Sequence, residues 1–583
     1  MFKLKRRIPL LLIGVIILAA IFRILWLDKV PGGLSNDELD YILNAKAVFL
    51  QGSDISNTWN PLTLTTPKSS FPQAEIMPLV TFIAIGSLPL SLFYSKLIYS
   101  VISIGIVILL YLIAKKLIGE KEAIIVGIIA SINPWLLFFG RTAYDAPNAV
   151  FFYLFGMYVL LIARGWKLLL AFPFFFLGFY SYIGTKLLLI PFATITIFYS
   201  WHFINKRNFK KQYVFLFSSC TLLLVVFALS VFFSNGVRTS EISNPGMEQI
   251  IQTTNNQRRL SIQTPLTNVF SNKYVVFTNF SLEKYINVFS PNFLFLHGDS
   301  KALFTLWEHG VFYLTDMFFL IIGLYFLFVK KRSVALLLFA LILIAPFPAV
   351  ISNVGVTYAI RAFLLGPLFL IFIGYGIFSI IFLKRGTRYR ITISTAIIIL
   401  YGVQLLNFSN IYFFRNPIYN SESFNFSSRV LMKYLSLQPS GQDAFVVNGN
   451  PITPFKQYLF YENVYTRKNT KEIAEMYRRN KFSLNNIHFI TCEEVMDIPI
   501  SSLLVYESGT KCKNIPKDNN NLVIAQLGDS GAIYHIRNDR VCNKYYLSSY
   551  ISGITFSDLS IEGLAEKRFC EKYIVNYSLS EVR

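Results

Sequence analysis

Apolar runs separated by short polar connections recur from the N-terminus to about residue 410. The runs are about 15 to 22 residues long, close to the length that an α-helix needs to cross the apolar part of a bilayer. About eleven such runs predict a polytopic α-helical membrane protein. Their expected ranges are 8–27, 97–114, 123–139, 146–163, 168–182, 187–203, 213–233, 311–329, 334–351, 362–383 and 391–409.

Basic residues gather in every second connection between these runs, where they predict orientation. Lys and Arg accumulate on the cytoplasmic side of membrane proteins. The basic clusters are Lys3/Lys5/Arg6/Arg7, Lys115/Lys116/Lys121, Arg164/Lys167, Lys206/Arg207/Lys210/Lys211, Lys330/Lys331/Arg332 and Lys384/Arg385/Arg388/Arg390. The N-terminus is therefore expected in the cytoplasm. With an odd number of spans, the loops at about 28–94 and 234–310 and the C-terminal part are expected outside it.

After residue 410 the chain becomes more polar and has the pattern of a soluble domain. Short apolar stretches predict strands at 443–447, 486–490, 502–506, 522–526 and 532–536. Helical spacing predicts helices at 427–437 and 470–480, with Ser427 and Thr470 as N-caps. We therefore expect two domains: a transmembrane module at 1–410 and a small extracytoplasmic α/β domain at 411–583.

The composition supports a membrane protein and excludes one class of partner. Hydrophobic residues make up 54% of the 583 residues and charged residues 15%, whereas a soluble protein carries about 25% charge. The net charge of +22 would suit a nucleic acid, but much of it sits in the short connections, where it sets orientation. We expect the lipid bilayer as a partner and no nucleic acid.

Four of the five cysteines lie in the expected external tail. Their even number and an oxidising compartment make the local bridges Cys492–Cys512 and Cys542–Cys570 a plausible pairing. None of the four has the Cys-x-x-Cys spacing of a zinc site.

The stretch Gly33-Leu34-Ser35-Asn36-Asp37-Glu38-Leu39-Asp40-Tyr41 follows the first apolar run and concentrates carboxylates at the membrane surface. Ionisable residues at membrane depth are candidates for function. Other polar residues from separate connections are expected at the same outer face: Glu75, Arg141, Tyr144, Asp145, Tyr180, Tyr182, Lys186, His297, Asp299, His309, Tyr358 and Arg361. This convergence predicts an extracytoplasmic site.

Several short motifs, in order, resemble those of one superfamily. They are Asn36-Asp37-Glu38 with Tyr41, Glu75-Ile76-Met77-Pro78-Leu79, Asn133-Pro134-Trp135, Arg141-Thr142-Ala143-Tyr144-Asp145, Tyr180-Ser181-Tyr182 with Lys186, Ser290–Phe295 with Gly298-Asp299, and Pro346–Ala349 with Arg361. Together they resemble the GT-C superfamily of polyprenyl-phosphate-sugar-dependent glycosyltransferases, which includes protein O-mannosyltransferases and lipid A aminoarabinose transferases. The chain departs from the pattern by lacking a Lys after Glu75 and by having Lys186 in place of an Arg.

The resemblance implies an inverting hexosyl- or pentosyltransferase. Its donor would be a sugar on a polyprenyl phosphate and its acceptor a hydroxyl of a lipid, glycan or protein. Transfer needs a base for the acceptor proton and cations for the departing phosphate. Asp37 is the expected base, and the other expected site residues are Glu38 and Asp145 as shaping carboxylates, Lys186, Arg361 and Arg141 as phosphate ligands, and Tyr41, Glu75, Tyr182, His297 and Asp299 as further candidates. No cofactor is certain; a divalent metal on Asp37 and Asp145 is left open.

Structural roles compete with these assignments. Glu38 could face water, and Asp145 could be the N-cap of the fourth span, with Pro147 in its first turn. Lys186 and Arg361 could be interface anchors. For His297 and Asp299, a polar turn around Gly298 is favoured over a ligand pair, and Asp40 is expected to be dispensable.

Two other classes of function remain open. A transporter or flippase of lipid-linked sugars would use charges near the midplane, where Arg23 is the discordant residue. A non-catalytic envelope-assembly protein would explain the missing Lys beside Glu75. The clustering of ionisable residues at one face favours the glycosyltransferase.

Overall fold

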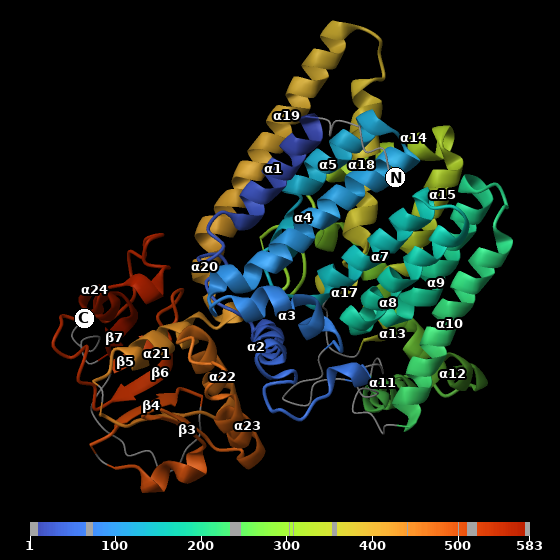
Figure 1. Cartoon of the computed structure of the whole chain (residues 1–583). Coiled ribbons are helices and arrows are strands. Elements are labelled where there is room, and N and C mark those ends of the chain that lie inside the picture. The colour runs from blue at the N-terminus through green and yellow to red at the C-terminus, as the bar shows by residue number, and fades with distance from the viewer. Residues whose placement is uncertain are drawn as a thin grey trace. The chain divides into compact units, whose positions relative to one another are not determined.

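The computed structural model describes residues 10–65, 74–233, 246–301, 303–306, 308–352, 358–439, 441–499, 501–509 and 522–577. The chain, drawn in Figure 1, divides into two compact units. The first unit contains Met1–Leu25, Tyr99–Gly140 and Tyr144–Phe408. The second contains Trp26–Ile98, Arg141–Ala143 and Ser409–Arg583, so it joins the loop after the first apolar run to the C-terminal tail.

The first unit is helical. Its helices are α1 (Leu10–Ile24), α5 (Glu120–Ile132), α6 (Pro134–Phe139), α7 (Asp145–Ile162), α8 (Ala171–Ser181), α9 (Ile183–Tyr199), α10 (Lys210–Phe233), α11 (Met247–Arg259), α12 (Pro265–Phe270), α13 (Lys273–Asn287), α14 (Asp316–Lys330), α15 (Arg332–Ile344), α16 (Phe347–Ile351), α17 (Tyr358–Arg361), α18 (Leu365–Ile381) and most of α4 (Leu92–Leu117) and α19 (Thr387–Ser409). Helix α18 packs against α14 and α5, and α7 packs against α8.

The apolar helices identify an integral membrane protein. Within the described residues, six helical stretches are long and apolar enough to cross a membrane: Leu92–Leu117, Asp145–Ile162, Ile183–Ile204, Lys210–Ser230, Arg332–Ile351 and Thr387–Tyr419. Each of the eleven expected ranges contains a helix, but the expected count of about eleven spans is not confirmed.

One expected span is interrupted. The apolar run at 123–139 was expected to form one helix, but α5 ends at Ile132 and α6 begins at Pro134. Proline has no N–H to donate and disfavours helical geometry in the residue before it. Asn133 lies at the break, and its side-chain oxygen accepts from the N–H of Leu136 at 3.1 Å, which caps α6.

The second unit contains a seven-stranded sheet in the order β2-β3-β1-β4-β6-β5-β7. The strands are β1 (Ala444–Val447), β2 (Phe482–Leu484), β3 (Ile487–Ile490), β4 (Leu503–Glu507), β5 (Leu522–Ala525), β6 (Ala532–Arg537) and β7 (Ile574–Asn576). Strand β1 pairs in parallel with β3 and β4, and the other pairs are antiparallel. The five expected strands are therefore confirmed to within about one residue at their ends.

The helices of this unit are α2 (Asn36–Gln51), α3 (Met77–Ser87), α20 (Asn416–Tyr419), α21 (Phe426–Ser436), α22 (Ile452–Tyr461), α23 (Thr470–Arg479) and α24 (Glu566–Tyr573). Helix α2 packs against α3 from its own loop and against α22 and α23 from the tail. The two expected tail helices are confirmed, but their N-caps are Asn425 and Asn469 and not Ser427 and Thr470.

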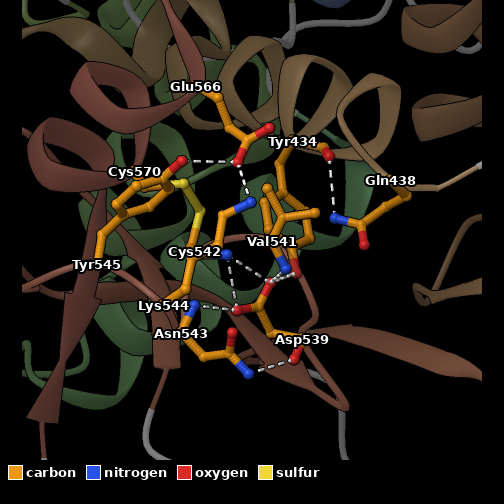
Figure 2. The surroundings of a disulfide bond; sticks show 10 residues. All are labelled: Tyr434, Gln438, Asp539, Val541, Cys542, Asn543, Lys544, Tyr545, Glu566 and Cys570. Carbon is orange, nitrogen blue, oxygen red and sulfur yellow. Dashed lines mark hydrogen bonds and ion pairs between the residues drawn. A yellow bond between two sulfur atoms is a disulfide. The ribbon is translucent and has the colours of Figure 1, made fainter.

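A disulfide bond between Cys542 and Cys570 links α24 to the segment that follows β6, with 5.3 Å between the two Cα atoms. Figure 2 shows the turn beside it, where the Asp539 carboxylate accepts from backbone N–H groups and from the Tyr434 hydroxyl at 2.6 Å. The expected Cys542–Cys570 bridge is confirmed. The other expected bridge includes Cys512, which lies outside the described residues.

Candidate active site

Helix α2 begins with a capping box between Ser35 and Glu38. The Glu38 carboxylate accepts from the Ser35 N–H at 2.8 Å and from its hydroxyl at 3.0 Å, and the Glu38 N–H points back to the Ser35 hydroxyl at 3.4 Å. This reciprocal pairing satisfies N–H groups that a helix start leaves without intrahelical partners. Glu38 is fully buried, so the interpretation that it faces water is wrong.

The second carboxylate oxygen of Glu38 connects two sequence motifs. It accepts from the N–H of Ala143 at 2.7 Å. The structure therefore brings together Asn36-Asp37-Glu38 and the start of the motif at Arg141, which are about a hundred residues apart. Glu38 holds this junction, and its expected shaping of a reaction site stays a prediction.

Arg141 is also buried, and it contacts both backbone carbonyl groups and an aromatic ring. Its guanidinium donates to the carbonyl groups of Trp26 at 3.0 Å and Val30 at 2.8 Å, and lies 4.9 Å from the centre of the Phe413 ring. Burial lowers the pKa of Arg141 from its ordinary value. These contacts give Arg141 a structural role that the sequence did not predict, and phosphate binding by Arg141 stays a prediction.

The segment that leads into α2, residues 30–35, is called here the α2 entry loop. Each carbonyl from Val30 to Leu34 accepts a hydrogen bond from a side chain elsewhere in the second unit. The donors are Arg141 to Val30 (2.8 Å), Lys96 to Pro31 (2.8 Å), Arg429 to Gly32 (2.6 Å), Lys96 to Gly33 (2.9 Å) and Asn425 to Leu34 (2.8 Å). Sequence reasoning missed Lys96, Asn425 and Arg429, because no motif links them to this loop.

The acidic residues of α2 differ sharply in exposure. Asp37 is exposed in the first turn, where partial positive charge at the helix N-terminus favours acidic residues. Asp40 is buried and forms an ion pair with Lys456 of α22, with 2.5 Å between Oδ1 and Nζ. Asp40 is therefore part of the packing, and the expectation that it is dispensable does not fit this pair.

Tyr41 and Glu75 belong to α2 and to the residues just before α3, and these two helices pack against each other. Tyr41 is in α2 with 7% of its surface exposed, and Glu75 precedes α3 with 2% exposed. Both belong to well-packed positions of the second unit, and their participation in a reaction stays a prediction.

In the first unit, Asp145 is the first residue of α7. Tyr144 occupies the N-cap position, so the interpretation of Asp145 as the N-cap is wrong by one residue. Pro147 lies in the first turn, as expected, where the missing N–H has no intrahelical partner to lose. Asp145 has 6% of its surface exposed.

Lys186 lies near the start of α9 among aromatic rings. Its ammonium is 4.4 Å from the centre of the Phe227 ring and 5.6 Å from that of Tyr180. Such rings attract a cation through their negative faces. Tyr182 precedes α9 as its N-cap residue and is 7% exposed. Lys186 is therefore surrounded by aromatic rings, and its binding of a phosphate stays a prediction.

Three further motif segments of the first unit meet at Ala359. The indole N–H of Trp135 donates to the Ala359 carbonyl at 2.8 Å, and the Ala359 N–H donates to Asp299 Oδ2 at 2.9 Å. The rings of Phe293 and Tyr358 lie 5.7 Å apart between centroids. The structure therefore brings together the segments around Trp135, Asp299 and Arg361.

Asp299 and His297 stand on either side of a turn. Gly298 has a φ of +74°, which favours glycine, and the Asp299 N–H donates to the Thr305 hydroxyl at 2.8 Å. His297 is exposed, whereas Asp299 is buried, and this burial raises the pKa of Asp299 to about 6. These contacts favour the polar turn over a ligand pair.

Arg361 ends α17 and is partly exposed. Lys284 of α13, which sequence reasoning missed, has its pKa lowered by burial and then by the positive charge of Arg361. The Lys284 ammonium donates to the Ser352 carbonyl at 2.8 Å. The first unit therefore holds a second cation close enough to Arg361 to interact with it.

In the part of the chain that the structure describes, no group of three or more His, Cys, Asp or Glu side chains is arranged to hold a metal ion. A divalent metal on Asp37 and Asp145 stays a prediction.

Comparison with protein families and with curated proteins finds no match to this chain. Among solved structures, it is similar to ArnT from Cupriavidus metallidurans bound to undecaprenyl phosphate, with a TM-score of 0.49 and 9% identity over 85% of this chain and 93% of that one. It is also similar to the oligosaccharyltransferase AglB from Archaeoglobus fulgidus in complex with an inhibitory peptide and a dolichol-phosphate, with a TM-score of 0.42 and 11% identity over 85% and 69%.

Both neighbours are GT-C glycosyltransferases, the superfamily that the sequence motifs resemble.

Proposed function

We propose that this chain is a membrane glycosyltransferase. It transfers a sugar from a polyprenyl-phosphate donor to a hydroxyl group of a lipid, glycan or protein on the extracytoplasmic face, with Asp37 as the base. The motifs around Asp37 resemble those of enzymes with this chemistry, and the disulfide between Cys542 and Cys570 suits a tail domain in an oxidising compartment.

The observation that carries the proposal is the contrast among the acids of α2. Glu38 and Asp40 are buried, with 0% and 3% of their surfaces exposed. Asp37 is the exposed one of the three, in a helical turn whose entry loop is hydrogen-bonded along its length. A base must reach a proton on its substrate and must be held in position. The exposure of Asp37 and the hydrogen bonds along its entry loop support this assignment.

The reaction follows from these assignments. The acceptor oxygen attacks the anomeric carbon of the donor sugar, and its proton passes to the Asp37 carboxylate. The bond between that carbon and the phosphate oxygen breaks, and polyprenyl phosphate departs with the electron pair. The resemblance of their motifs supports Lys186 and Arg361 as ligands of the departing phosphate, whose negative charge a cation stabilises as it develops. Inversion at the anomeric carbon is part of the same proposal.

Arg23, the residue that favoured a transporter, has a structural role. Arg23 is buried in α1, where its guanidinium donates to the Ser103 hydroxyl at 2.8 Å and to the Ser131 carbonyl at 2.9 Å. These bonds between helices give Arg23 a packing role.

Purified protein in proteoliposomes tests the proposal with a panel of radiolabelled polyprenyl-phosphate sugars and lipid, glycan and peptide acceptors. The expected result is a new glycoside and an equal amount of released polyprenyl phosphate. Movement of labelled donor between leaflets with no new glycoside would contradict the proposal and support the flippase.

A further inference from the structure

The tail of the second unit contacts the residues on both sides of Asp37. Asn425, which immediately precedes α21, donates from its side-chain amide to the Leu34 carbonyl at 2.8 Å and to Asn36 Oδ1 at 3.2 Å. Lys456 of α22 pairs with Asp40 at 2.5 Å. Along the chain, Asp37 therefore lies between the tail contacts at Leu34 and Asn36 and the tail contact at Asp40.

Arg429 adds a contact from the first turn of α21. Its guanidinium donates to the Gly32 carbonyl at 2.6 Å and forms two bonds to the Glu562 carboxylate, at 2.7 and 2.5 Å. A bidentate bond of this kind fixes the orientation of the guanidinium. Arg429 thus connects the α2 entry loop to the tail, and Glu562 of the tail fixes the orientation of Arg429.

The backbone fits as closely as the side chains. A Cβ atom added to Gly33 would lie 2.0 Å from the carbonyl oxygen of Phe424, directly before Asn425. The entry loop and the start of α21 therefore touch through main-chain atoms, and a shift of either one would move the other.

We propose that Asn425 and Arg429 of the C-terminal tail are positioning residues for Asp37: they fix the entry loop, and through it the first turn of α2. The tail would then be a structural part of the catalytic centre. The inference has a positional half, that the tail fixes the first turn of α2, and a catalytic half, that this position is needed for sugar transfer. The catalytic half rests on the proposed function, whereas the positional half does not.

Asn425 allows a clean variant. Its backbone has a φ of +51°, a left-handed conformation that glycine adopts without strain. Asn425→Gly therefore removes the amide and preserves the backbone. Asn538→Gly is the matched control, because Asn538 has a φ of +57° and its amide donates to the Ser502 carbonyl at 2.8 Å, within the sheet region and away from the entry loop.

Hydrogen exchange of the full-length protein in lipid nanodiscs tests the positional half. The amides of Glu38 and Leu39 donate to Ser35 and report on the first turn of α2. In Asn425→Gly these amides are expected to exchange about tenfold faster than in the wild type, the order of effect of one lost hydrogen bond. Asn538→Gly is expected to leave them unchanged. Unchanged exchange in Asn425→Gly and in Arg429→Lys would overturn the inference.

Kinetics test the catalytic half. Asn425→Gly and Asn425→Asp are expected to lower kcat by about tenfold or more, because a small displacement of a base is costly, while KM for the donor stays within about twofold. Normal kcat together with faster exchange would overturn the positioning role. If the wild type transfers no sugar from any donor, the proposed function fails, and the exchange result still decides whether the tail fixes the loop.

Discussion

The carboxylate of Asp40 and the ammonium of Lys456 form an ion pair of 2.5 Å, with only 5% and 7% of the two side chains exposed. The residues are more than four hundred positions apart and join α2 to α22. Removing one partner of a buried pair leaves the other charge buried without compensation, which costs about 3 kcal/mol or more.

A double-mutant cycle measures this pair. Lys456→Met is expected to lower the unfolding free energy of the second unit by about 3 kcal/mol, and Asp40→Asn/Lys456→Met is expected to restore most of it. The measurement is denaturant unfolding of the full chain in nanodiscs. Additive effects of the two single variants would show that the charges do not interact.

Gly33→Ala should disturb the contact between the entry loop and the tail. The new Cβ would meet the Phe424 carbonyl at 2.0 Å, and because both partners are backbone one of them must move. We expect a loss of about 2 kcal/mol in unfolding free energy and a fall in kcat. Gly449→Ala is the control, since nothing lies within 4 Å of a Cβ at Gly449. Equal effects of the two variants would contradict the close contact.

Glu462, which follows α22, should make stability depend on pH. Burial raises the pKa of Glu462 to about 7, above the ordinary value of 4.5, with a smaller opposing effect of Lys433. The folded state therefore holds the Glu462 proton more tightly than the unfolded state. The stability that this protonation adds is fully present below about pH 4.5 and is lost as the pH rises through about 7. Glu462→Gln is expected to stabilise the protein at pH 8 by about 1 kcal/mol, since partial exposure reduces the effect, and to change little at pH 4. A constant difference across this range would contradict the assignment.

The disulfide between Cys542 and Cys570 spans 28 positions. Closing a loop of this length stabilises a domain by about 3 kcal/mol. Replacing both cysteines by alanine is therefore expected to lower the stability of the tail by that amount under oxidising conditions. In excess reductant, the variant and the wild type are expected to unfold alike. A difference that persists in reductant would show that packing, and not the bridge, is responsible.

Local features of the fold were readable from the sequence. The apolar runs predicted helices, and the short apolar stretches of the tail predicted five of its strands, because these patterns depend on neighbouring residues. The pattern Ser35-x-x-Glu38 is also a local signal, because it is typical of a capping box. The helix break at Asn133-Pro134 is likewise a local signal, because a proline inside a helical pattern ends or kinks the helix.

The contacts that hold the entry loop were not readable. Asn425 and Leu34 are 391 positions apart, and Lys96 and Pro31 are 65 apart. A side chain that donates to a carbonyl leaves no pattern in the sequence, since the carbonyl belongs to any residue. Arg141 was predicted as a phosphate ligand and Asp40 as a dispensable acid, because their buried contacts are with residues that are distant in the sequence.

Asp37→Asn tests the central claim most directly. The amide is nearly the same size as the carboxylate and cannot serve as the base, so sugar transfer is expected to fall by about a thousandfold with folding and donor binding unchanged. Glu472→Gln, the same type of change at an exposed acid in the first turn of α23, is expected to retain full activity. Transfer at the wild-type rate by Asp37→Asn would contradict the assignment of Asp37 as the base.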